Sequence, residues 1–174
     1  RSPETLTNID KWILSTLQNR IIQATEAMEK CQVREAIQQS FFMIDIDLGW
    51  YLRRINAEKT TGRHSHSSGA RSKSRVLLKL AETWIRLLAP FAPHICEESW
   101  ERLGGKGFVS RTAWPVADKS LINTAVEEEE SYLMRVLEDT REIIKVTNIR
   151  PKKIFYYVPS KWMYEVYKVM LGAT

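Results

Sequence analysis

Residues 88–115, LAPFAPHICEESWERLGGKGFVSRTAWP, decide the fold that the sequence predicts. Pro90 cannot continue the helix that leads into it, because proline lacks the amide hydrogen that a helical hydrogen bond needs. Pro93 instead suits the first position of a new helix. The pair Gly104-Gly105 suits the left-handed conformation that commonly ends a helix. The stretch therefore predicts two helices joined by a sharp corner, and it offers no catalytic group.

Apolar residues recur every three or four positions along most of the chain, which is the period of an amphipathic helix. The first helix is predicted to start near Thr7, with Asp10 completing a capping box, and the last to open at Thr124 with Glu127 as its capping partner. The apolar stripes of the five predicted helices cover residues 13–28, 33–55, 77–91, 93–103 and 126–144. With no strand among these helices, the fold class is mainly α, an antiparallel helical bundle over residues 1–150.

Aromatic residues on these stripes predict the core. Trp84, Phe91 and Trp100 flank the proline corner, and we expect them to be buried where the helices on its two sides meet. Asp45 lies within the apolar face of the second predicted helix. A buried carboxylate needs a partner, so we expect it to pair with an arginine or an indole N–H.

Residues 151–174 differ in character from the bundle. Residues 153–158, KIFYYV, predict one short strand, and residues 162–171 predict one amphipathic helix. A lone strand has no partner for its backbone groups. We therefore expect a short β-α appendage that opens a further α/β domain.

The net charge of +5 is unevenly distributed. Residues 53–75 hold seven basic side chains and a single acidic one. Residues 56–75 are rich in Ser, Gly and Thr, and they predict a mobile basic loop. Arg53 and Arg54 are predicted to close the second helix just before this loop. Such cations suit a phosphate backbone, because each neutralised phosphate releases counterions.

Several classes of function are excluded. No apolar run approaches the ~18 residues of a membrane span, so we expect a cytoplasmic protein without a membrane partner. Cys31 and Cys96 lack CxxC spacing and are predicted as buried thiols rather than a disulfide. His64 and His66 have no further ligand at metal-binding spacing. No glycine-rich phosphate loop follows a strand. We therefore predict no catalytic residue, no metal site and no cofactor in this chain.

Three segments carry a resemblance to a known family. These are residues 10–15, DKWILS, residues 50–54, WYLRR, and the proline corner at residues 88–100. Together they resemble the anticodon-binding helical bundle of the class I synthetases that charge leucine, isoleucine and valine. Residues 50–54 are similar to the end of the second helix in leucyl enzymes of the archaeal and eukaryotic-cytosolic type. At the position after the second proline, His94 resembles the leucyl enzymes, which carry histidine there, whereas the other two families usually carry phenylalanine.

The resemblance implies an ATP-dependent leucine–tRNA ligase, with magnesium accompanying ATP, in the parent protein. The nucleotide-binding and editing domains are absent here, so the fragment is expected to bind a leucine-accepting tRNA and the remaining domains of the synthetase without charging the tRNA itself. If the bundle lies along a tRNA stem, basic side chains at helix ends should contact phosphates. These predicted tRNA-binding residues are Arg53, Arg54, Lys145, Arg150, Lys152 and Lys153.

Two alternatives remain at this point. One is the same domain of a valyl- or isoleucyl-tRNA synthetase. The other is a helical interaction module that binds a protein helix rather than RNA. The salt dependence of binding distinguishes the second alternative from RNA binding, because binding to a phosphate backbone weakens steeply as ionic strength rises.

Overall fold

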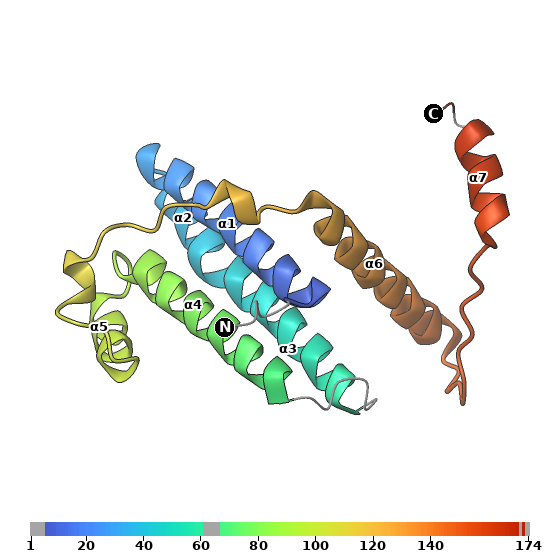
Figure 1. The fold of residues 1–174 in the computed structure, drawn as a ribbon, viewed down its shortest axis with the longest axis horizontal. Coiled ribbons are helices and arrows are strands. Elements are labelled where there is room, and N and C mark those ends of the chain that lie inside the picture. Colours follow the sequence, from blue (N-terminus) through green and yellow to red (C-terminus); the bar gives the residue numbers. More distant parts are fainter. Residues whose placement is uncertain (1–5, 61–66, 171, 173–174) are drawn as a thin grey trace. The chain divides into compact units, whose positions relative to one another are not determined.

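The computed structural model describes residues 6–60, 67–170 and 172. The chain divides into two compact units, unit 1 (Arg1–Leu133) and unit 2 (Met134–Thr174). All regular elements in the described residues are helical, which confirms the predicted mainly α bundle (Figure 1). The elements are α1 (Asn8–Glu29), α2 (Val33–Ile37), the π-helix η1 (Gln38–Met43), α3 (Ile44–Thr60), α4 (Ser67–Leu88), α5 (Pro93–Arg102), the 3-10 helices η2 (Val109–Arg111) and η3 (Lys119–Leu121), α6 (Thr124–Thr147) and α7 (Lys161–Met170).

The start of α1 confirms the predicted capping box. Thr7 is the N-cap residue, and its hydroxyl accepts the amide hydrogen of Asp10 at 3.3 Å. Asp10 Oδ2 in turn accepts the Thr7 amide hydrogen at 3.1 Å. The other carboxylate oxygen of Asp10 accepts the Tyr51 hydroxyl at 2.6 Å, and both residues are fully buried. The cap of α1 is therefore also a contact between α1 and α3.

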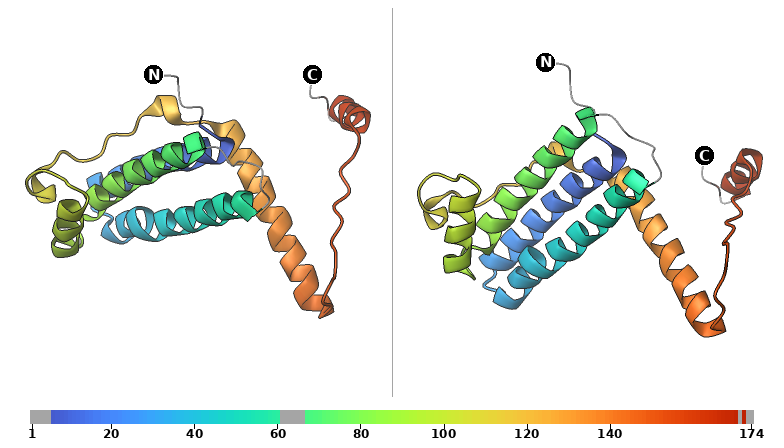
Figure 2. Two further views of the ribbon diagram at one scale, coloured as in Figure 1. Left: turned by 60° about the horizontal axis from the view of Figure 1, so that its bottom comes forward. Right: turned by 90° about the horizontal axis from the view of Figure 1, so that it is seen from below.

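Helix α1 is the central element of unit 1. It lies beside α3 and α4, and the views in Figure 2 agree on this arrangement. Every residue from Trp12 to Gln18 is buried, so the middle of this helix is covered all round. A helix in this position has no solvent face, and its polar side chains need partners within the protein.

The π-helix η1 displaces the buried face of the second predicted helix by one position. A π turn contains one residue more than an α turn, because its hydrogen bond reaches one residue further. The buried residues of this region are Ala36 of α2 and Ser40 within η1, and Phe41 of the predicted stripe is 41% exposed. The prediction for Asp45 is also wrong: Asp45 is exposed, and the buried carboxylate is that of Asp47.

Asp47 pairs with an arginine of α1. Arg20 Nε donates to Asp47 Oδ2 at 2.8 Å, and Arg20 Nη1 donates to Gln39 Oε1 of the π-helix at 3.1 Å. Burial raises the pKa of Asp47 above its ordinary value, against the opposing effect of Arg20. The pair links α1 to η1 and α3.

A left-handed turn at Cys31, with a φ of 55°, follows α1. The Gln32 amide donates to the Ala27 carbonyl at 2.8 Å, and the Cys31 amide donates to the Met28 carbonyl at 3.0 Å, which is a Schellman motif. Cys31 is consequently exposed, which corrects the prediction that it is buried within a helix, whereas Cys96 is buried as predicted.

The proline corner joins α4 to α5 as the sequence predicts. Ala89, Cys96 and Val109 are buried there, and Trp100 packs against them. The predicted core residues at the corner are half-buried rather than fully buried; these are Trp84, Phe91 and Trp100. They lie at the end of the bundle, where fewer elements meet than around α1. Gly104 has the predicted left-handed conformation after α5, with a φ of 81°.

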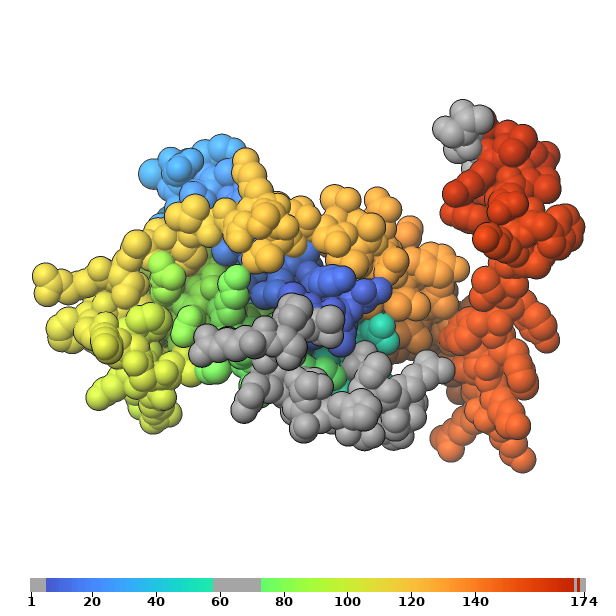
Figure 3. Space-filling view, in the orientation of Figure 1, coloured from blue at the N-terminus to red at the C-terminus, as the bar shows by residue number. Residues whose placement is uncertain are grey.

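The segment that returns from α5 to α6 is held along α1 by polar side chains of that helix. Gln18 Oε1 accepts the Asp118 amide hydrogen at 2.9 Å, and Trp114 Nε1 donates to the Thr25 hydroxyl at 2.9 Å. Figure 3 shows this segment, in yellow to light orange, against the blue surface of α1. The buried polar groups of α1 thus obtain their partners from an irregular segment far away in sequence.

Asn123, rather than Thr124, caps α6. Asn123 Oδ1 accepts the Val126 amide hydrogen at 3.3 Å, while the Asn123 amide donates to the Ser15 hydroxyl at 2.7 Å. The predicted capping box of Thr124 and Glu127 is therefore wrong. Glu127 does not turn back to the cap, because its carboxylate accepts the Ser15 hydroxyl of α1.

Two further predictions need correction. Residues 153–158 do not form a strand: the structure has no strand among the described residues to pair with them, although α7 follows as the predicted helix. The predicted loop at 56–75 is much shorter than expected, because α3 continues to Thr60 and α4 begins at Ser67. Residues 61–66 lie outside the described residues.

Gly105 lies against the Trp100 indole ring so closely that a Cβ atom there would be 2.2 Å from Trp100 Cε2. We expect Gly105→Ala to destabilise the protein by about 1–3 kcal/mol, because the ring has to leave its packed position. Gly49→Ala is the matched control: nothing lies within 4 Å of its added Cβ, and alanine in a helix should stabilise by about 0.5–1 kcal/mol. Urea unfolding of both variants tests this, and equal effects would contradict it.

Glu97 fixes the loop that follows α5. Its Oε2 accepts the Val109 amide hydrogen at 2.7 Å, and its Oε1 accepts the Ser110 amide and hydroxyl hydrogens at 3.1 and 2.7 Å. The Ser110 hydroxyl, with these backbone amides, lowers the pKa of Glu97 below its ordinary 4.5. The charged carboxylate is therefore favoured in the folded state.

This pKa shift predicts a pH-dependent effect of Glu97→Gln. A carboxyl whose pKa is lower in the folded than in the unfolded state contributes stability above the unfolded pKa and loses that contribution as pH falls through the folded pKa. Glu97→Gln should thus lower the melting temperature at pH 7, and the gap to the unsubstituted protein should close as pH falls below 4.5. Melting curves between pH 7 and pH 3 test this, and a gap that stays constant would show that charge is not involved.

Candidate nucleic-acid interface

Arg54 belongs to an internal ion pair. Its Nη2 donates to Glu130 Oε1 at 2.9 Å, and its Nε donates to Glu130 Oε2 at 3.2 Å. Trp50 Nε1 donates to the same Oε2 at 2.9 Å. The Glu130 side chain is 5% exposed and the Arg54 side chain 34% exposed. These contacts join α3 to the first turns of α6 and explain how a carboxylate can be buried there.

Arg53, the neighbour of Arg54, has a different environment. It is exposed, and its guanidinium carbon lies 5.7 Å from the centroid of the Trp50 ring. This separation is within the range of a cation–π interaction. The two adjacent arginines therefore differ in their environment. Arg54 is bonded to a carboxylate inside the bundle, and Arg53 is accessible at the surface.

Neither arginine closes a helix, which corrects the sequence prediction. Helix α3 continues through both residues to Thr60. Residues 56–59, NAEK, contain no glycine or proline, so the backbone can continue as a helix where the composition becomes polar. Arg53 and Arg54 consequently point to different sides of a regular helix, about 100° apart.

The second predicted basic group lies in unit 2. Lys145, Arg150, Lys152 and Lys153 are all exposed. Lys145 lies in the last turn of α6, and the other three lie in the segment between α6 and α7. No acidic residue occurs between residues 143 and 164, so this segment is a continuous source of positive charge.

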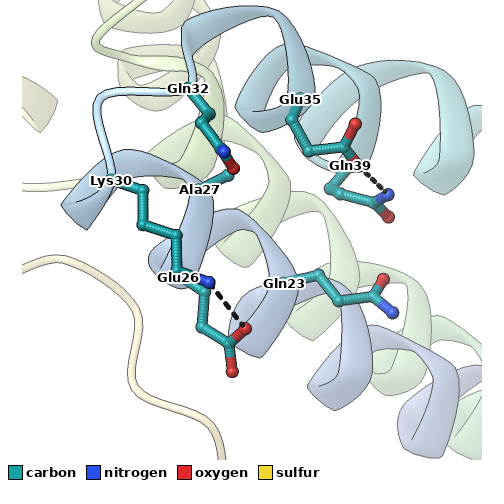
Figure 4. Close-up of a pocket in the computed structure, with 7 residues that line it drawn as sticks. All are labelled: Gln23, Glu26, Ala27, Lys30, Gln32, Glu35 and Gln39. Carbon is teal, nitrogen blue, oxygen red and sulfur yellow. Dashed lines mark hydrogen bonds and ion pairs between the residues drawn. The ribbon is translucent and has the colours of Figure 1, made fainter.

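A polar pocket of about 180 Å³ lies between the end of α1 and the α2–η1 segment (Figure 4). Its lining contains two carboxylates, Glu26 and Glu35, and a single cation, Lys30. Lys30 Nζ is 4.0 Å from a carboxylate oxygen of Glu26. This lining is net negative and therefore unsuited to a phosphate group.

Within residues 6–60, 67–170 and 172, no three His, Cys, Asp or Glu side chains are grouped so as to hold a metal ion. Among the helices of that part, none is long and apolar enough to cross a bilayer. His64 and His66 lie outside the described residues, and His94 is exposed at the start of α5.

Sequence reasoning missed Glu130 and the role of Trp50. Glu130 closes the acidic run Glu127–Glu130, where negative charge is also favourable simply because the run lies at the start of a helix. It lies four residues after Val126, and both are buried on one face of α6. That spacing could have identified Glu130 as an inward-facing carboxylate in need of a cation.

Comparison with known proteins agrees with this architecture. The family model described as the anticodon-binding domain of tRNA ligase matches residues 10–156. A leucine–tRNA ligase of Pyrococcus abyssi is 44% identical over 166 residues, and one of Methanothrix thermoacetophila is 42% identical over 166 residues. Each of these alignments covers 95% of this chain and 16% of the relative.

A leucine–tRNA ligase of Methanocaldococcus jannaschii is 38% identical over 167 residues, which is 96% of this chain and again 16% of the relative. The chain thus spans 16% of the length of the relatives it matches. The family match includes α1 from Asp10 onward, the proline corner and the whole of α6. The chain therefore belongs to the family of the anticodon-binding domain of tRNA ligase.

Proposed function

We propose that residues 1–150 are the tRNA-binding helical bundle of a leucine–tRNA ligase and that they bind a leucine-accepting tRNA. The identity of 35–44% to archaeal leucine–tRNA ligases over nearly the whole chain is the observation that carries the proposal. Arg53 of α3 and the basic side chains of residues 145–153 are exposed, and they support the proposal because they suit contact with an RNA backbone.

The parent enzyme would join leucine to its tRNA with ATP and magnesium in the cytoplasm. The groups that perform this chemistry belong to the remaining domains of the synthetase, which are the second class of partner that we propose. This chain would contribute binding and orientation of the tRNA alone.

Residues 151–174 would form the opening of the C-terminal α/β domain of that enzyme. This proposal is supported by the exposure of their apolar side chains, with Tyr157 94% exposed and Trp162 65% exposed. Exposed apolar surface of this extent is typical of an interaction site.

Within the bundle, Arg53 would contact a backbone phosphate of the tRNA, and Lys145, Arg150, Lys152 and Lys153 would form a second group of such contacts. Arg54 was predicted to share this role. We now assign it to the stability of the bundle, because Glu130 already binds its guanidinium. An arginine at a phosphate contributes affinity without reading the base sequence.

The adjacent arginines should therefore respond differently to substitution. We expect Arg53→Ala to weaken binding of a leucine-accepting tRNA transcript about five- to tenfold, to reduce the salt slope by about one unit and to leave the melting temperature unchanged. Arg54→Ala should instead lower the melting temperature, because Glu130 would remain buried without its cation. Affinity titrations over a series of salt concentrations and melting curves measure both effects.

Arg34→Ala is the control for a general loss of positive charge. Arg34 is exposed on α2, and Arg53 lies 19 positions further along the helical run, about 28 Å at 1.5 Å per residue. Screening at physiological salt acts over about 8 Å, so Arg34→Ala should leave the salt slope unchanged. If the three variants were indistinguishable from the unsubstituted chain in binding, RNA recognition at α3 would be refuted.

A further inference from the structure

We propose that Trp50 is a positioning residue for Arg53: its indole ring holds the Arg53 guanidinium ready for a phosphate of the RNA backbone. The inference rests on the proposed function, since it requires an RNA phosphate at Arg53. It goes further by assigning a role in RNA binding to a buried side chain that does not itself touch RNA.

Residues three positions apart on a helix lie on the same face, which places Trp50 and Arg53 together on α3. The guanidinium carbon is 5.7 Å from the ring centroid. Trp50 is 7% exposed, so packing holds its ring in one orientation, whereas Arg53 is exposed to solvent. A fixed aromatic face therefore lies beside an accessible cation.

Glu130 of α6 holds the ring at its indole N–H. Its carboxylate accepts the Trp50 indole hydrogen at 2.9 Å and so fixes the plane of the ring. The same carboxylate binds two nitrogens of Arg54. The positive charge of Arg54 is therefore balanced by Glu130 within the bundle. As a result, Arg54 repels the neighbouring Arg53 guanidinium less than an unpaired arginine would. A negative carboxylate at the indole N–H also strengthens the attraction of the ring for a cation.

This arrangement lowers the entropic cost of binding a phosphate. An exposed arginine samples many rotamers, and this freedom is lost when its guanidinium binds. Arg53 has lost part of that freedom before RNA arrives, because its guanidinium is held at the ring. Contact through the flat face of the guanidinium would leave its N–H edge available for a bidentate contact with phosphate oxygens.

A double-mutant cycle tests the proposal in this chain. The variants are Trp50→Leu, Arg53→Ala and both together, and the probe is a leucine-accepting tRNA transcript titrated at fixed salt. We expect Trp50→Leu to weaken binding about two- to fivefold, with an unchanged salt slope. In the Arg53→Ala background it should have no effect. A loss of the same size in both backgrounds, or no loss in either, overturns the positioning role.

A second measurement does not depend on RNA or on a variant that loses a buried ring. In the free chain, the ring current of Trp50 should shift the NMR signal of the Arg53 Nε–H group upfield, and Trp50→Phe should reduce this shift without abolishing it. An Arg53 signal at the position of an unstacked arginine overturns the positioning role and leaves the phosphate contact intact. If Arg53→Ala alone leaves tRNA affinity unchanged, the phosphate contact itself fails, and the two failures are distinguishable.

Discussion

The burial of the middle of α1, residues 12–18, on all sides is the constraint on which unit 1 depends. Ser15 and Gln18 lie in the covered middle of this helix, where an unbonded polar group costs free energy. Each accepts a backbone amide hydrogen from the segment that returns from α5, at Asn123 and at Asp118. The irregular segment needs acceptors for its amides as much as α1 needs donors for its side chains. Hydrogen bonds therefore determine the path of the returning segment across the bundle. Apolar packing alone would not fix the position of this segment along α1.

Local signals predicted the features that depend on neighbouring residues. The capping box of Thr7 and Asp10, the proline corner and the left-handed Gly104 were all predictable, because each follows from the steric and hydrogen-bonding properties of a few adjacent residues. The buried face of residues 33–43 was not, because the helical period does not continue across a π-helix. The predicted capping box of α6 was wrong for another reason. The carboxylate of Glu127 accepts a hydrogen bond from Ser15, which is more than one hundred residues away in sequence.

The candidate interface was predictable only in part. Charge alone singled out Arg53 and Arg54, but it cannot distinguish two adjacent arginines. Their difference depends on Glu130, which reaches α3 from an element about 76 residues further along the chain. A tertiary contact of this kind decides which cation remains at the surface, and it is invisible to periodicity. For the basic residues of unit 2, the sequence pattern and the observed exposure agree, because no other side chain of the described chain covers them.

The π-helix has a consequence for how this domain can change in length. Removing one residue from a regular α-helix rotates everything beyond it by about 100°, which would turn Asp47 and Trp50 away from their partners. Within Gln38–Met43 the chain already carries one residue more than an α-helix needs, so a deletion there converts the π turn to an α turn and preserves the faces on both sides. Across the continuous run from α2 to α3, we therefore expect single-residue deletions to be tolerated at this site and not in the flanking turns. Related sequences of different length should then differ at this position.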